Sequence, residues 1–295
     1  MQSDGTTLTD GQVTPLRVFH RICLCGVFWV LPAIAGCPEQ PQARPPTEAP
    51  LKVEDIMMPE INMSPAPGGG DMAWRDEFDG YLLNMDKWSY RSLGRRHDAY
   101  NVPDAVRLDG LGHLEIVTRS EGDRILTGMI GTQDKFERTY GYFEARVKFQ
   151  KQPGHWSMFW LQSERMGKFI GDPARGGAEI DVFEYMPNTP DMITQGLRWN
   201  GYVDSRKSAL NVARIEPAME WHVIGMDWTP REYVFYVDGQ ETWRTGQAVS
   251  QIPQYIVLSL EVGGWAGELS EEKLPDSVLF DYVRVYKTRP IQPRP

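Results

Sequence analysis

Gly176-Gly-Ala-Glu-Ile-Asp-Val-Phe-Glu-Tyr185 is the stretch from which the rest of this 295-residue chain is best interpreted. It places three carboxylates, Glu179, Asp181 and Glu184, among strand-forming side chains. Side chains alternate between the two faces of a strand, so Glu179 and Asp181 share one face while Glu184 falls on the other. A β-bulge at Val182–Phe183 adds one residue and returns Glu184 to the face of the other two.

The bulged spacing is typical of an acid pair that cleaves glycosidic bonds. Two glutamates four strand positions apart lie roughly 13 Å apart at Cα, and inward-leaning side chains bring their carboxyl groups to roughly 5–6 Å. Retaining glycosidases hold their two carboxyl groups about 5–5.5 Å apart. The alternative is a solvated acidic edge strand, but such an edge does not carry Ile180, Val182 and Phe183 between Gly-Gly and Pro-Asn turns.

This motif resembles the E-x-D-x-x-E signature of glycoside hydrolase family 16, in the bulged branch that includes laminarinase-like, agarase-like and carrageenase-like enzymes. Further segments are similar to that family: Tyr140–Arg146, His155–Trp160, Asp227–Gly239 and Asp281–Tyr286. The likeness covers about residues 73 to 287. It implies an all-β fold, a curved two-sheet antiparallel β-sandwich (a jelly roll of the concanavalin A-like type).

Short segments of alternating apolar residues predict an all-β domain independently of the resemblance. Asp-Gly, Gly-Gly, Pro-Gly and Asn-Thr-Pro turns separate them, and no amphipathic helical pattern competes. The expected strands cover residues 106–108, 113–118, 142–149, 156–161, 178–185, 193–199, 222–228, 233–237, 255–262 and 278–286. Many short strands with little helix indicate a β-sandwich or barrel.

Composition restricts the partners of the chain. The net charge of −9 argues against nucleic acid, whose phosphates need a basic footprint, and predicts an acidic cleft that disfavours polyanions without local Arg or Lys. The 10 Trp residues suit a sugar-binding surface. The three cysteines, Cys23, Cys25 and Cys37, all precede Pro38, so no intrachain disulfide forms beyond it. We expect a monomer that binds a polysaccharide.

The N-terminal region predicts export. An apolar run from Ile22 to Ile34 follows Arg17 and Arg21 and has the length of a signal-peptide h-region. It ends in Ile-Ala-Gly-Cys37, which resembles the lipobox of bacterial lipoproteins, and a lipid on Cys37 would anchor the mature protein to a membrane surface. A plain signal peptide with an incidental Cys is the alternative. The protein is therefore expected as a cell-envelope lipoprotein or an extracellular protein.

Four segments follow from these patterns. Residues 1–37 form the leader and signal peptide, and residues 38–71 form a Pro/Gly-rich disordered linker, because they cannot bury enough apolar surface to become ordered. The catalytic domain covers residues 72–288, and residues 289–295 form a Pro-rich tail.

The resemblance implies that Glu179 is the nucleophile, Glu184 the acid/base and Asp181 the residue between them. Three carboxylates on one strand cannot all ionise cheaply, so at least one pKa is raised and a protonated Glu184 can serve as the acid. Once Glu179 has become a neutral glycosyl ester, Glu184 can act as the base towards water. This chemistry requires no cofactor.

Aromatic side chains are expected to line the floor of the cleft, because sugar rings stack on them. Trp156 and Trp160 are four residues apart on an expected strand and hence share a face. Trp199 follows on the next expected strand and Trp265 lies in a Gly-rich loop. By resemblance, all four match positions where the family tends to place cleft aromatics. Each of these side chains also fits ordinary core packing.

Two further positions carry open interpretations. Arg198 stands where laminarinase-like members often have His, and it can contact a sulfate or uronate bidentately or form a salt bridge to a nearby carboxylate. Asp281 matches the carboxylate with which family members often hold a structural calcium, although capping of a strand end explains it equally well.

The predicted function is retaining endo-hydrolysis of internal β-linkages in a polysaccharide. By resemblance, a β-1,3- or mixed-linked glucan is the leading substrate and an agar- or carrageenan-type galactan the second. A non-catalytic carbohydrate-binding lipoprotein is the rival, but a lectin has no need to keep three acids. A transglycosylase, which would share the covalent intermediate, also stays open.

Overall fold

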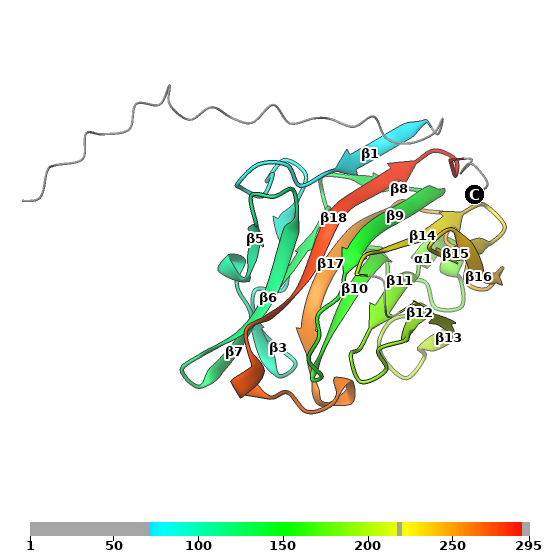
Figure 1. Ribbon diagram of the computed structural model, residues 1–295. Helices are drawn as coiled ribbons and strands as arrows, with labels where there is room; N and C mark the ends of the chain where they lie inside the picture. The colour runs from blue at the N-terminus through cyan, green and yellow to red at the C-terminus, as the bar shows by residue number, and fades with distance from the viewer. Residues whose placement is uncertain (1–70, 217–219, 291–295) are drawn as a thin grey trace, which may run out of the picture. The chain divides into compact units, whose positions relative to one another are not determined.

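The computed structural model describes residues 71–216 and 220–290. The predicted leader, the lipobox at Cys37 and nearly all of the predicted linker lie outside the described residues, as does most of the predicted tail. Regular structure in the described part is almost entirely β (Figure 1), which confirms the all-β prediction. The exceptions are short: α1 (Pro173–Gly176), η2 (Pro103–Ala105), η3 (Gly264–Ala266) and η4 (Glu271–Lys273). None of the described helices is long and apolar enough to span a membrane.

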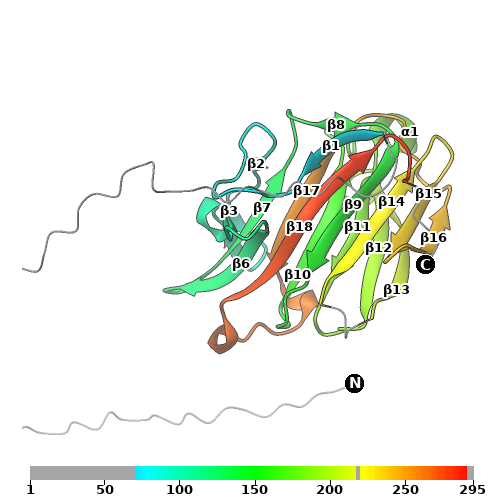
Figure 2. The ribbon, with the colours of Figure 1, turned by 45° about the horizontal axis from the view of Figure 1, so that its top comes forward.

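One sheet, here called the outer sheet, has the order β5–β6–β18–β9–β14–β15–β16, with β1 beside the C-terminal half of β18 (Figure 2). All of these neighbours are antiparallel. The strands are β1 (Met72–Asp76), β5 (Val106–Leu108), β6 (Leu114–Glu121), β9 (Gly141–Lys148), β14 (His222–Trp228), β15 (Tyr233–Val237), β16 (Gln240–Thr245) and β18 (Asp276–Tyr286).

The inner sheet has the order β13–β12–β11–β10–β17–β7, with β8 beside β17 and β2 beside β7. Its strands are β2 (Ser89–Tyr90), β7 (Arg124–Gly131), β8 (Glu137–Arg138), β10 (His155–Gln162), β11 (Glu179–Tyr185), β12 (Met192–Trp199), β13 (Lys207–Arg214) and β17 (Gln254–Val262). A hairpin of β3 (Gly94–Arg96) and β4 (Ala99–Asn101) joins β7, and β7 also pairs with β6.

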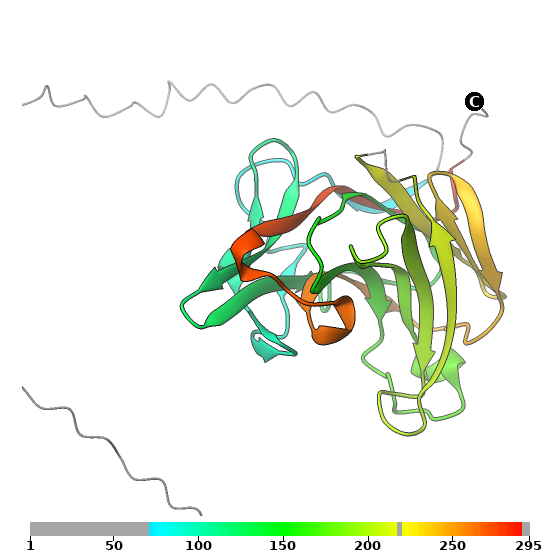
Figure 3. The same ribbon diagram turned by 60° about the horizontal axis from the view of Figure 1, so that its bottom comes forward.

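The main core lies between the two sheets. Alternate side chains of β10 and β11, such as Phe159, Leu161 and Ile180, are fully buried together with Phe143 and Val147 of β9 in the outer sheet. The strands curve (Figure 3). The face of the inner sheet that points away from the main core is available for a site. The predicted curved two-sheet sandwich is confirmed.

Two long strands of the inner sheet, β7 and β13, were not predicted from the sequence, and neither were the two-residue strands β2 and β8. β7 contains Gly128 and Gly131, which weaken any strand pattern, but a Cβ on Gly128 would lie 2.5 Å from Cγ2 of Val106. β13 is mostly exposed because it is the edge of the sheet, and its exposed residues include the apolar Leu210 and Val212. Close packing in one strand and edge exposure in the other conceal the alternation of apolar residues.

Candidate active site

β11 carries an extra residue between its second and third acid. Asp181 pairs with Gly196 and Glu184 pairs with Thr194, so three steps along β11 face two steps along β12. The pairing of β11 with β10 also skips Val182. The bulge predicted from the spacing of the carboxylates is therefore confirmed.

The bulge sorts the side chains of β11 between the core and the opposite face. Val182 and Phe183 are consecutive, yet both are fully buried in the main core. Asp181 and Glu184 lie on the other face with Glu179. The partner strand leaves room for Asp181, because a Cβ on Gly196 would lie 2.7 Å from the Asp181 Oδ2 atom.

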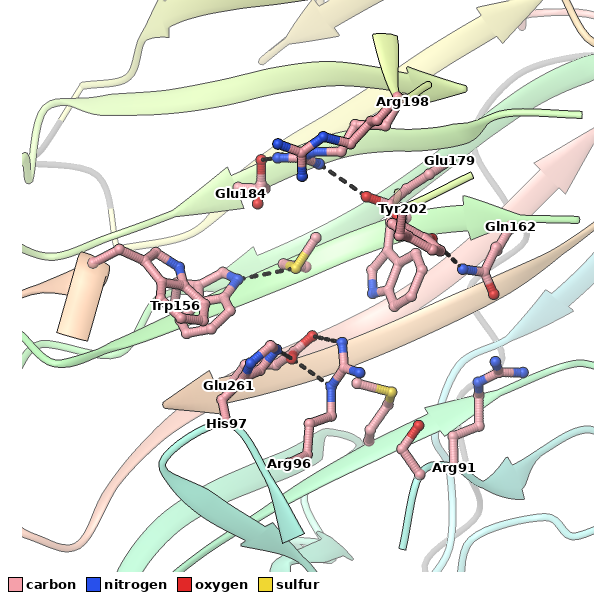
Figure 4. Close-up of a pocket in the computed structure, with 16 residues that line it drawn as sticks. Arg91, Arg96, His97, Trp156, Gln162, Glu179, Glu184, Arg198, Tyr202 and Glu261 are labelled. Atoms are coloured by element: carbon pink, nitrogen blue, oxygen red, sulfur yellow. Dashed lines mark hydrogen bonds and ion pairs between the residues drawn. The ribbon is translucent and has the colours of Figure 1, made fainter. Parts of the chain in front are cut away.

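A cleft of about 680 Å³ opens on this face of the inner sheet (Figure 4). Glu179 and Glu184 line it, whereas Asp181 lies beneath them with no exposed surface. The other lining residues are Arg91, Ser92, Arg96, His97, Met129, Trp156, Met158, Trp160, Gln162, Arg198, Tyr202, Arg206, Glu261 and Trp265. The three predicted acids are thus brought together at one cleft.

Arg198 of β12 pairs directly opposite Glu179 and contacts all three acids. Its Nη1 donates to Oε1 of Glu179 at 3.0 Å and to Oδ2 of Asp181, and its Nη2 donates to Oε2 of Glu184 at 2.9 Å. Of the two interpretations left open for Arg198, the structure shows the salt bridge. One planar guanidinium therefore reaches both glutamates.

Tyr202 is a site residue that the sequence analysis missed. Its hydroxyl donates to Oε2 of Glu179 and accepts from Nε2 of Gln162 at 2.5 Å. Both oxygens of Glu179 therefore accept hydrogen bonds, from Arg198 and from Tyr202, which fixes the orientation of the carboxylate. The only sequence signal near Tyr202 is an Asn-Gly turn after β12, which is typical of any loop.

The other two acids lie in surroundings that oppose ionisation. Burial raises the pKa of Glu184; Arg198 opposes that shift and the charge of Glu179 adds to it. Burial also raises the pKa of Asp181, and Glu184 and Glu179 reinforce the effect. A raised pKa of Glu184 suits the acid of a retaining glycosidase, which must carry a proton before the reaction.

The predicted aromatic residues divide between the cleft and the core. Trp156 and Trp160 lie in the cleft floor, and the Trp160 indole N–H donates to the Ser259 hydroxyl at 3.2 Å. Trp265 is 54% exposed, with its ring centroid 4.4 Å from that of Trp156. Trp199 instead packs against the main core, so its predicted place in the cleft is wrong.

The cleft is not acidic, contrary to the expectation from net charge. Four arginines line it beside three glutamates: Arg91, Arg96, Arg198 and Arg206 with Glu179, Glu184 and Glu261. Glu261 is buried and pairs with Arg96 at 2.6 Å and with His97 at 3.3 Å. These arginines come from separate segments, so composition alone does not predict that they gather.

Asp281 does not fit the calcium ligand that the resemblance implies. Its Oδ2 accepts from Nη1 of Arg146 at 2.6 Å, and that cation would repel a second one. No group of three or more His, Cys, Asp or Glu side chains within residues 71–216 and 220–290 could hold a metal ion.

Known proteins resemble this chain in sequence and in fold. A keratan-sulfate endo-1,4-β-galactosidase from Sphingobacterium multivorum is 29% identical over 241 residues, which cover 74% of this chain and 55% of that protein. A β-glucanase from Rhodothermus marinus is 26% identical over 247 residues, which cover 74% of this chain and 85% of that one. The X-ray structure of an endo-β-1,3-glucanase from Pyrococcus furiosus matches with a TM-score of 0.63 and 26% identity, covering 73% of this chain and 93% of that one.

The chain thus spans about half the length of the first relative and most of the second. The sequence profile of the glycosyl hydrolases family 16 matches residues 96–284, which include the bulged strand and every residue that lines the cleft except Arg91 and Ser92. As the motif on β11 predicted, this chain belongs to glycosyl hydrolases family 16.

Proposed function

We propose that this protein is a retaining endo-glycosidase that hydrolyses internal β-linkages of a polysaccharide, with a β-1,3- or mixed-linked glucan as the leading substrate. The observation that carries the proposal is the pair Glu179 and Glu184, set on a bulged strand, lining one cleft and bound by one guanidinium. The glucanases among the similar proteins support the choice of a glucan.

In the first step, Glu184 donates its proton to the glycosidic oxygen while Glu179 attacks the anomeric carbon. The bond to the leaving sugar breaks, and an ester forms between Glu179 and the retained sugar. In the second step, Glu184 takes a proton from water, the water oxygen attacks the anomeric carbon, and Glu179 leaves as a carboxylate. Two inversions at one carbon give net retention.

Three neighbours position the nucleophile in this scheme. Arg198 and Tyr202 each hold one oxygen of Glu179, which fixes the orientation of the carboxylate. Asp181 is buried beneath and shares Arg198 with both glutamates. We assign Asp181 the task of holding that guanidinium in place.

A β-linked galactan is the second candidate substrate. A similar protein named keratan-sulfate endo-1,4-β-galactosidase supports it. We also propose that the protein is exported and carries a lipid on Cys37, because of its N-terminal sequence. The monomeric state is a separate proposal.

The test is release of reducing ends from laminarin, lichenan, agarose, porphyran and carrageenan by the unmodified protein, Glu179→Gln and Glu184→Gln. We expect one polymer to be cleaved, Glu179→Gln to be inactive, and Glu184→Gln to be slower by about 10²–10⁴-fold, the contribution of general acid–base catalysis.

An aryl oligosaccharide with a good leaving group separates the two glutamates. Its phenolate departs without a proton, so Glu184→Gln should still release phenol in a first burst, whereas Glu179→Gln should not. Hydrolysis that survives in Glu179→Gln would contradict the assignment of the nucleophile. Binding of a polymer without cleavage by the unmodified protein would indicate a lectin.

A further inference from the structure

The cleft has a cationic end, marked by Arg91, and a further arginine, Arg206, also lines the cleft. The proposed hydrolysis gives neither residue a task. Neither residue forms a salt bridge with a carboxylate of the described residues, whereas the other two cleft arginines, Arg96 and Arg198, do. We propose that the cationic end binds an anionic substituent of the polysaccharide, a sulfate ester or a carboxylate. This inference rests on the proposed function, because it assigns a substrate feature to the same cleft.

Arg91 is fixed in orientation by neutral partners only. Its Nη1 donates to Oε1 of Gln133 and its Nη2 to the Tyr255 hydroxyl at 3.1 Å, and the guanidinium lies 4.6 Å from the Tyr255 ring centroid. Its Nε atom is buried and has no hydrogen-bond partner. A half-buried charge without a counterion is unfavourable, and a bound anion would supply the missing partner.

A chain of hydrogen bonds places Arg91 on the side of the nucleophile. Tyr255 donates to Oε1 of Gln162 at 2.5 Å, Gln162 donates to Tyr202, and Tyr202 donates to Glu179. Figure 4 shows Arg91 and Gln162 on the same side of the cleft. An anion bound at Arg91 would therefore belong to a sugar close to the scissile bond.

Arg206 belongs to the loop that supplies Tyr202. It is exposed, lies four residues after Tyr202 and lines the same cleft, and its backbone N–H donates to the Val203 carbonyl at 2.8 Å. An exposed, unpaired guanidinium on this loop is free to turn towards an anion near the nucleophile.

The opposite end of the cleft has a different chemistry. Trp156 and Trp265 lie beside each other there, and the His97 ring centroid is 4.8 Å from that of Trp265. The guanidinium of Arg96 already forms a salt bridge with Glu261. We therefore expect a neutral, stacked sugar at the aromatic end and a charged sugar at the cationic end.

The whole protein carries a net charge of −9, so its long-range field repels a polyanion. The cationic end must then bind the anion by direct contact. Added salt should weaken this contact only modestly, whereas it screens attraction that acts beyond a Debye length of about 10 Å. A polymer with few, spaced anionic groups fits this arrangement better than a densely charged one.

The experiment compares laminarin with two lightly substituted derivatives of the same preparation, one sulfated and one carboxymethylated. The full chain is assayed for the ratio of kcat/KM on each derivative to kcat/KM on laminarin. We expect this ratio to exceed one for the derivative that carries the preferred anion. It should fall about tenfold in Arg91→Gln and in Arg206→Gln, as each variant loses a charge-assisted hydrogen bond.

Arg95→Gln and Lys207→Gln are the matched controls, because both residues are exposed neighbours outside the cleft lining. They should leave the ratio unchanged. Ratios of one or less for both derivatives, or a ratio that Arg91→Gln does not lower, would overturn the inference while the proposed function stands.

If none of the three polymers is cleaved, the proposed hydrolysis of laminarin is wrong. Binding at the cationic end can then still be tested by how strongly each polymer, cast into a native gel, retards migration of the protein. Stronger retardation by a derivative than by laminarin, lost in Arg91→Gln, would support the inference. Equal retardation by all three polymers would overturn it.

Discussion

At the scale of single residues, Arg198 balances the charges of the catalytic centre. Burial opposes a charge on Arg198, but Asp181, Glu184 and Glu179 outweigh it and raise the pKa of the guanidinium, so Arg198 stays charged. Its charge stabilises the ionised form of Glu184. The pKa of Glu184 is therefore raised by burial but held below the value that burial alone would give.

Replacing Arg198 should move the pH profile of the enzyme. In the proposed mechanism Glu184 is the acid and must be protonated, so its loss of a proton should set the alkaline limb of kcat/KM. In Arg198→Gln the pKa of Glu184 rises further, because Glu179 and Glu261 still disfavour its ionisation. We expect the alkaline limb to move up by about one pH unit.

The control keeps the charge. Arg198→Lys should retain an alkaline limb close to that of the unmodified protein, even if its rate is lower because Lys cannot reach both glutamates at once. Rates over a pH series on the polymer that is cleaved give both limbs. An alkaline limb that stays in place in Arg198→Gln would show that Arg198 does not tune Glu184.

At the scale of elements, the parity of strand positions explains which predictions succeed. Glu179, Asp181 and Glu184 share a face only if one residue is extra, and the apolar neighbours leave no other place for it than Val182–Phe183. That bulge, and the all-β sandwich around it, follow from the sequence because alternation along a strand is a local rule.

Loop residues at the site do not follow from the sequence in this way. Tyr202 and Arg206 lie on the loop after β12. Arg91 follows β2 and Arg96 ends β3, two short strands without an apolar pattern. Their positions depend on how distant segments pack, and nothing local marks them. The wrong expectation of an acidic cleft arises for the same reason, because net charge says nothing about where four arginines gather.

Two tryptophans that the sequence analysis treated alike should behave differently. Trp199 packs against the main core, on the face of β12 opposite Arg198, so Trp199→Ala should lower the free energy of unfolding by about 2–3 kcal/mol with KM nearly unchanged. Trp265 is exposed at the cleft, so Trp265→Ala should raise KM severalfold and change the unfolding free energy by less than about 1 kcal/mol. Urea unfolding and steady-state kinetics measure both, and the reverse pattern would contradict the assignment of the two faces.

At the scale of the whole domain, Asp276 ties the two sheets together. It begins β18 of the outer sheet, and its Oδ2 accepts from the backbone N–H groups of Lys151 at 2.7 Å and Gln152 at 2.6 Å, just before β10 of the inner sheet. The fully buried His155 of β10 lies with Nε2 3.3 Å from the same oxygen. Burial acts to raise the pKa of Asp276, but these hydrogen bonds outweigh it and hold the pKa below its usual value.

The ionised form of Asp276 should therefore stabilise the fold in a defined pH range. Because the folded pKa lies below the unfolded value of 3.8, the contribution is fully present above that value and is lost as the pH falls through the folded pKa. Asp276→Asn should lower the free energy of unfolding by about 1–2 kcal/mol at pH 7, and by less at pH 3. Urea unfolding at both pH values measures this difference. Asp123 lies in an exposed turn, so Asp123→Asn is the control and should leave the free energy of unfolding unchanged at both pH values. An equal loss at pH 7 and pH 3 would mean that Asp276 stabilises the domain by its shape and not by its charge.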